Sequence, residues 1–175
     1  MADTTTRVDL GFDQDQLQGL IGAVKEKPER GQTVWTATTR WLSGFASEAR
    51  IREFTIRMDE PPPLGGGNTA PNMVEVVLGA YGSCLTTGYV MNAGLRGIKL
   101  TGVEIELEGD LDLQGFFDLD QGVTPGYSGV RAKVRLTAPD ASAEQIRELH
   151  DLVVRTSPVG AIINRPVNVE TELVD

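Results

Sequence analysis

The sequence contains one cysteine, Cys84, and one histidine, His150. A thiol acts as a nucleophile or redox group only as its thiolate, which a nearby cation or a helix N-terminus must stabilise. The helix predicted around Cys84 begins about three turns earlier, too far for its dipole to act. From the residues alone, Cys84 is therefore either a small buried hydrophobe or a reactive thiol that takes a cation from elsewhere in the fold.

Metal and hydrolase chemistry are poorly supported. One histidine and one cysteine, far apart in the chain, supply too few soft ligands for a zinc site, so no metal or cofactor is expected. A serine-hydrolase triad would need His150 as the base for Ser157, without the usual G-x-S-x-G turn. An exposed helix histidine beside a capping serine is the favoured interpretation. Four further acidic residues lack EF-hand spacing and are interpreted as solvated strand and loop faces: Asp110, Asp112, Asp118 and Asp120.

The composition restricts the class of protein. The chain has 175 residues, 40% hydrophobic and 23% charged, which fits one globular domain. Its net charge of −9 disfavours binding to nucleic acid or to an anionic membrane surface. The N-terminus does not resemble a secretory signal, and one cysteine cannot form an intramolecular disulfide. We therefore expect a cytoplasmic protein with neither nucleic-acid nor membrane partners.

Periodicity and turn residues predict an α+β fold, because strands group on both sides of a central helix. The predicted elements, in chain order, are a helix over 13–28, strands within 33–41, 45–51 and 53–58, an irregular connector over 59–71, a long helix over 72–93, strands over 100–113 and 130–138, a helix over 142–157, a helical turn around 161–163 and a closing strand over 166–174.

The long central helix has a clear start and an unusual surface. Asn72 and Glu75 form an N-x-x-E entry of the capping-box type. One apolar stripe contains Val74, Val77, Leu78, Tyr81 and Leu85, and a second contains Met73, Val76, Ala80, Cys84, Thr87 and Met91. A helix that is apolar on most of its circumference is buried on most sides. In so short a chain, this pattern indicates burial against a second copy.

Two segments together carry a family resemblance. PNMVEVVLGAYGSCL (71–85) resembles the central-helix pattern P-x-P-x-E-L-L-L-A-A-L-G-S-C of the OsmC/Ohr family, and TSPVGAIINRPVNVETEL (156–173) resembles its S/C-P-V segment before a last strand. The resemblance implies an OsmC-like domain over 31–175, preceded by an N-terminal extension over 1–30 with a short helix. It also implies antiparallel sheets around a buried central helix, in an interwoven homodimer with paired central helices.

The resemblance also implies a chemistry. In peroxidatic members, the first of two cysteines attacks an organic hydroperoxide and becomes a sulfenic acid, and the second condenses with it to a disulfide that a dithiol opens. An arginine stabilises the first thiolate, and a glutamate orients that arginine. Carried over, the first cysteine falls on Cys84 and the second on Ser157, which cannot form a disulfide. The orienting glutamate of the peroxidatic members falls on Val74, one position before Glu75, and the arginine is either Arg40 or Arg50.

Two functions remain open. In the first, Cys84 is a lone peroxidatic thiol whose sulfenate an external thiol reduces. A hydrophobic pocket at the subunit interface would select alkyl hydroperoxides, with its lining from Tyr81, Leu85 and either Phe116 or Phe117. In the second, the dimer is not catalytic and encloses a small hydrophobic ligand at the same interface. Ser157 favours the second function, whereas Cys84 at the family's reactive position favours the first, which is the one we expect.

Overall fold

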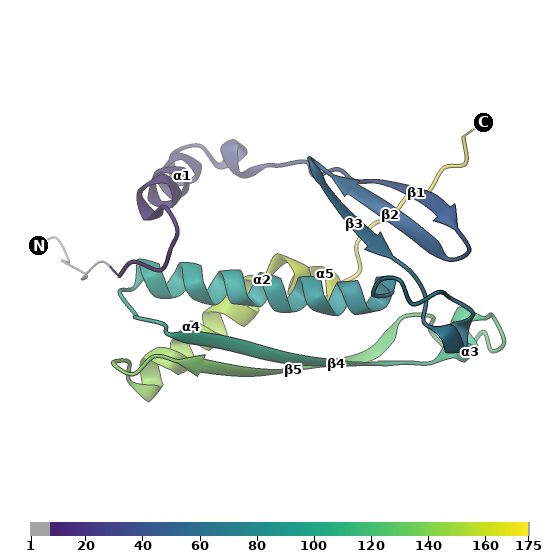
Figure 1. Ribbon diagram of the computed structural model, residues 1–175. Coiled ribbons are helices and arrows are strands. Elements are labelled where there is room, and N and C mark those ends of the chain that lie inside the picture. The colour runs from purple at the N-terminus through teal and green to yellow at the C-terminus, as the bar shows by residue number, and fades with distance from the viewer. Residues whose placement is uncertain (1–7, 175) are drawn as a thin grey trace, which may run out of the picture. The chain divides into compact units, whose positions relative to one another are not determined.

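The computed structural model describes residues 8–174, which form two compact units. The N-terminal unit is Phe12–Val77, and the C-terminal unit runs from Leu78 onward and includes the short stretch before Phe12. Figure 1 shows antiparallel strands together with the long helix α2, so the α+β prediction is confirmed. The predicted boundary between an extension over 1–30 and a domain over 31–175 is different from the division into these two units, and it stays a prediction.

The N-terminal unit begins with helix α1 (Gln14–Glu26) and the short helix η1 (Pro28–Gly31). The side chain of Asp13 accepts a hydrogen bond from the Gln16 amide, which confirms the predicted start of α1. A three-stranded antiparallel sheet follows, in the order β1 (Thr38–Ser43), β2 (Ala46–Ile51) and β3 (Phe54–Met58).

The first strand is shorter than predicted. Residues 33–37 were expected to belong to it, and this expectation is wrong. The register pairs Thr38 with Arg50, and β2 ends at Ile51, so the earlier residues extend beyond the strand that could pair with them. Val34 and Trp35 are consequently exposed.

The connector after β3 is irregular, as predicted, but it is organised by one buried carboxylate. Asp59 accepts hydrogen bonds from the Thr69 amide, the Thr69 hydroxyl and the Glu60 amide. The bonds from Thr69 hold the pKa of Asp59 below its ordinary value. The chain turns so tightly here, beside the 3-10 turn η2 (Pro62–Leu64), that a Cβ on Gly66 would lie 1.8 Å from the Glu60 carbonyl oxygen.

The long helix α2 (Met73–Leu95) begins in the N-terminal unit and continues into the C-terminal one. The C-terminal unit then contains β4 (Gly102–Leu111), the short helix α3 (Leu113–Phe116), β5 (Tyr127–Thr137), α4 (Ala143–Thr156) and α5 (Pro158–Asn164). Strands β4 and β5 pair as an antiparallel ribbon, along which α2 lies (Figure 1).

The core of the C-terminal unit joins α2, α4 and the ribbon. Its buried side chains are Leu85, Tyr89, Ala93, Ile98, Leu100, Leu149 and Val153. The other face of the ribbon is charged, with Arg135 beside Glu106 and Arg131 beside Asp110. The ribbon is therefore apolar toward the helices and ionic toward solvent, as the alternation in the sequence predicts.

Within the C-terminal unit, helix α2 is buried on one side only. Leu85, Tyr89 and Ala93 are in the core, whereas Ala80 and Thr87 on the second stripe are exposed. Covering of the other side by a second copy stays a prediction. None of the helices in the described ranges is long and apolar enough to cross a membrane.

The closing strand predicted over 166–174 is not formed. The segment follows α5 without a ladder partner among the described residues, and Val167, Val169 and Leu173 are exposed. A strand requires a neighbour for its backbone hydrogen bonds, so alternation alone could not produce one here.

Candidate functional site

The site forms where α4 approaches α2. Gly88 lies one turn after Cys84, and a Cβ on Gly88 would come within 2.8 Å of Val153 Cγ1. Because glycine has no side chain, the buried face of α4 packs closely against the backbone of α2. This packing brings the end of α4 to Cys84, and Cys84 Sγ lies 3.3 Å from Ser157 Oγ.

Ser157 is fixed by its place between two helices. It follows the last residue of α4 and is the N-cap of α5, with Pro158 in the first helical position. Its hydroxyl oxygen accepts a hydrogen bond of 3.1 Å from the Gly160 amide. The residue is 5% exposed, so the hydroxyl is directed at the sulfur from a buried position.

An open pocket of about 390 Å³ lies beside the sulfur. It is lined by Cys84, Thr87, Gly88, Met91, Val153, Thr156, Ser157 and Pro158. No charged side chain is among them, and the Thr156 hydroxyl is occupied by its bond to the Leu152 carbonyl. The pocket is therefore suited to a small, uncharged and largely apolar molecule that reaches the sulfur.

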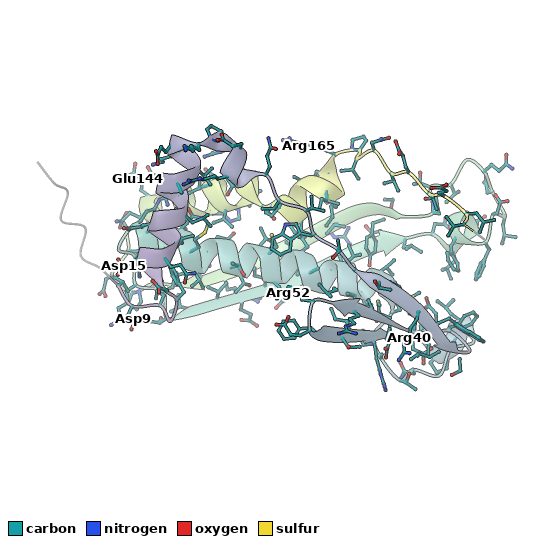
Figure 2. All side chains as sticks on the ribbon, turned by 90° about the horizontal axis from the view of Figure 1, so that it is seen from above. Asp9, Asp15, Arg40, Arg52, Glu144 and Arg165 are labelled. Atoms are coloured by element: carbon teal, nitrogen blue, oxygen red, sulfur yellow. The ribbon has the colours of Figure 1, made fainter. Side chains whose placement is uncertain are left out.

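The arginines and the glutamate named from the sequence have partners of their own. Arg40 Nε donates to Glu48 Oε1 at 2.8 Å on the three-stranded sheet, where Figure 2 labels it, and Arg50 Nε lies 3.4 Å from the Arg52 carbonyl oxygen. Both belong to the N-terminal unit. A pairing of either arginine with Cys84 therefore stays a prediction.

Glu75 is a capping residue. Its carboxylate accepts a hydrogen bond from the Asn72 amide, and the Asn72 side chain accepts one from the Glu75 amide, both at 2.8 Å. This reciprocal pair confirms the predicted start of α2. Nine residues separate Glu75 from Cys84, which corresponds to opposite sides of the helix. A role in orienting an arginine stays a prediction.

None of the four residues predicted to contact substrate lines the pocket beside Cys84. Leu85 is 1% exposed and belongs to the core, against which Tyr81 packs. Phe116 and Phe117 are exposed at the α3 end of the ribbon. Their predicted contribution to a pocket between subunits stays a prediction.

Sequence reasoning missed residues that do line the pocket, chiefly Met91 and Val153. Met91 is seven residues after Cys84 and shares its face of α2, so helical spacing was a usable signal. Val153 is on the buried face of α4, but the sequence does not show that this face meets Cys84.

His150 is engaged elsewhere and does not pair with Ser157. Its Nδ1 lies 2.7 Å from the hydroxyl of Tyr89, which is fully buried. Burial raises the pKa of Tyr89 to about 12. Within residues 8–174, no group of three or more His, Cys, Asp or Glu side chains is placed to hold a metal ion.

Comparison with known proteins identifies a family. The family model described as OsmC-like protein matches residues 65–172. A comparison with curated proteins finds no match.

Solved structures share the fold at low sequence identity. An OsmC-like protein from Mycoplasma pneumoniae superposes with a TM-score of 0.65 at 14% identity, over 75% of this chain and 88% of that one. The organic hydroperoxide resistance protein OsmC from Legionella pneumophila gives 0.56 at 15% identity, over 76% and 92%. An organic hydroperoxide resistance protein from Elizabethkingia anophelis gives 0.55 at 14% identity, over 76% and 91%.

Proposed function

Since the chain belongs to the family of OsmC-like proteins, we propose that it is a thiol redox protein that reduces organic hydroperoxides through Cys84. The observation that carries the proposal is the position of Cys84 Sγ, which contacts a buried hydroxyl and also opens onto an uncharged pocket. Structural relatives with the same fold are named as organic hydroperoxide resistance proteins.

The proposed reaction uses one sulfur of this chain. The Cys84 thiolate attacks the peroxide, so that an S–O bond forms and the O–O bond breaks. The leaving alkoxide takes a proton from water and departs as an alcohol, and Cys84 remains as a sulfenic acid. An external thiol then displaces water to give a mixed disulfide, and a second external thiol restores Cys84. Ser157 contributes no sulfur, so the reductant must supply both thiols.

The lining of the pocket supports an organic substrate. Met91, Val153 and Pro158 present apolar atoms to it, and no charged group competes for the peroxide. An alkyl or aryl substituent gains by leaving water for such a surface, whereas hydrogen peroxide has no substituent to bury. We therefore expect cumene hydroperoxide to react faster than hydrogen peroxide.

The homodimer is part of the proposal. The extended segments 33–37 and 166–174 have no ladder partner in the described part of this chain, and each carries exposed apolar residues. The face of α2 with Ala80 and Thr87 is also open. A second copy offers surfaces for all three. Light scattering should give twice the chain mass of 18.9 kDa, and a monomer at that mass would exclude the dimer.

A second candidate is binding of a small hydrophobic ligand without catalysis. Ser157 at the position of the family's second cysteine and the apolar lining of the pocket favour it. In that case an apolar molecule should protect Cys84 from alkylation and be recovered unchanged.

The test is a single-turnover reaction followed by mass spectrometry. Reduced protein is mixed with one equivalent of cumene hydroperoxide in the presence of dimedone, which traps sulfenic acid. We expect one dimedone adduct per chain at Cys84, release of the corresponding alcohol, and no adduct in Cys84→Ala. An unmodified Cys84 with intact hydroperoxide would overturn the proposal and leave ligand binding as the function.

A further inference from the structure

In the contact between Ser157 and Cys84, the protonation state of the sulfur determines which atom donates the hydrogen bond. A hydroxyl has one hydrogen to donate and two positions that accept. The Gly160 amide occupies one accepting position of Ser157 Oγ. With a neutral thiol, either Cys84 or Ser157 can be the donor. With a thiolate, only the hydroxyl has a hydrogen to give.

We propose that the Ser157 hydroxyl donates a hydrogen bond to the ionised sulfur of Cys84 and acts as a positioning residue that keeps this thiol reactive. The inference rests on the proposed function, because it explains how a site without a second cysteine stays chemically competent. A hydrogen bond to a charged acceptor is stronger than one between neutral groups, so this contact stabilises the thiolate more than the thiol.

Among the hydroxyls that line the pocket, the structure gives that of Ser157 a contact with the sulfur. No charged side chain lines the pocket in the C-terminal unit, and Thr156 directs its hydroxyl to the Leu152 carbonyl. Ser157 is almost completely buried, so water does not compete for its hydrogen. The Gly160 amide fixes the oxygen, which keeps the donor 3.3 Å from the sulfur without a further ordering cost.

The replacement of a cysteine by serine then gains a chemical meaning. A second sulfur would trap the sulfenic acid as an intramolecular disulfide, whereas a hydroxyl supports the thiolate and leaves the oxidised sulfur open to the pocket. The site is arranged for a thiol that is resolved from outside the chain.

The experiment compares the pH profile of Cys84 alkylation by iodoacetamide in five proteins. These are wild type, Ser157→Ala, Ser157→Thr, Ser157→Val and the control Ser142→Ala. Thr and Val have the same shape and differ by the hydroxyl, so that pair isolates the donor if Ser157→Ala folds poorly. Ser142 is the N-cap of α4 and does not contact the sulfur, so its replacement reproduces the loss of a cap alone.

We expect Ser157→Ala and Ser157→Val to move the midpoint of the profile upward by about one pH unit, with alkylation at pH 7 slower by up to about sevenfold. Ser157→Thr should keep the wild-type midpoint. Ser142→Ala should lose about 2–4 °C in Tm without any change in the profile. Identical profiles for Ser157→Thr and Ser157→Val would overturn the inference and leave Ser157 as a helix cap.

The same proteins separate this inference from the proposed function. A shifted profile in Ser157→Val together with no reaction between wild type and cumene hydroperoxide would keep the hydrogen bond and reject the peroxidase. Unshifted profiles with normal sulfenate formation would reject the role of Ser157 and keep the peroxidase.

Discussion

Two serines begin the two C-terminal helices, and their surroundings differ. Ser142 begins α4 in an exposed capping box, accepting from the Gln145 amide while Gln145 Oε1 accepts from the Ser142 amide. Ser157 begins α5 with the same type of cap, but it is buried and its hydroxyl also meets Cys84. One residue type thus caps a helix twice and contacts the cysteine once, and the difference arises from tertiary packing alone.

Packing of α4 on α2 creates the difference. Leu149 and Val153 are fully buried, and Gly88 lets Val153 approach the α2 backbone. The start of α4 at Ser142 stays exposed, whereas its end at Ser157 is carried into the pocket.

The largest expected effect comes from placing sulfur at the two caps. Oxidation of Ser157→Cys with one equivalent of cumene hydroperoxide should produce an intrachain disulfide with Cys84. The new sulfur takes the place of the Ser157 oxygen, which lies 3.3 Å from Cys84 Sγ. Ser142→Cys, the matched control, should form no intrachain disulfide. Mass spectrometry after alkylation reads out both, and two alkylated thiols in oxidised Ser157→Cys would contradict the geometry.

A smaller effect is expected where α2 and α4 touch. Gly88→Ala places a methyl 2.8 Å from Val153 Cγ1 and should cost about 1–3 kcal/mol of unfolding free energy. It should also slow Cys84 alkylation by displacing Ser157. Gly79→Ala in the same helix meets open space, and should be neutral or stabilising by up to about 1 kcal/mol. Urea denaturation of both variants tests this, and equal stabilities would argue against close packing at Gly88.

A comparable effect is expected at the middle of α4, where Tyr89 bonds to His150. The pKa of Tyr89 is raised from 10.0 to about 12, so the unfolded chain loses this proton first as the pH rises. Stability is therefore unaffected below pH 10 and falls between pH 10 and about 12, by at most about 1.4 kcal/mol per pH unit.

Tyr89→Phe should remove that slope and lower stability at pH 7 by about 1 kcal/mol through the lost hydrogen bond. Its Cys84 alkylation profile should match wild type, since the hydroxyl does not reach the sulfur's pocket. Denaturation curves at several alkaline pH values provide the measurement, and an unchanged slope in the variant would assign it to other groups.

The smallest effect is expected on the exposed face of the ribbon. The hydrogen bond from Arg135 holds the pKa of Glu106 below its ordinary value. The stability that this ion pair contributes is therefore present at neutral pH and is lost as the pH falls through the lowered pKa. Both groups are exposed to solvent and salt. Glu106→Gln should change the urea midpoint at pH 7 by little more than experimental error and leave Cys84 unaffected. A large loss of stability would show that the ribbon face is covered.

Local signals in the sequence identified most of the fold. The helix starts at Asp13, Asn72 and Ser142 were predicted, because a helix start depends on three or four neighbouring residues. Strands were wrongly predicted over 33–37, which is rich in β-branched and aromatic residues, and over 166–174, where polar and apolar residues alternate, because pairing depends on a neighbouring strand. Pattern predicts the tendency to form a strand and does not supply the partner.

The site was predictable only in part. The family resemblance named Cys84 and Ser157, whose side chains lie 3.3 Å apart in the structure. The pocket beside them depends on how Val153 meets Gly88, which no local pattern in either helix encodes.

The proposed function requires that Cys84 is a thiol activated toward organic hydroperoxides. The most direct measurement is the rate constant for its oxidation by cumene hydroperoxide at pH 7, relative to free cysteine under the same conditions. The account predicts a rate at least about tenfold above free cysteine, which is only a few per cent thiolate at this pH. A rate equal to or below that of free cysteine would contradict it.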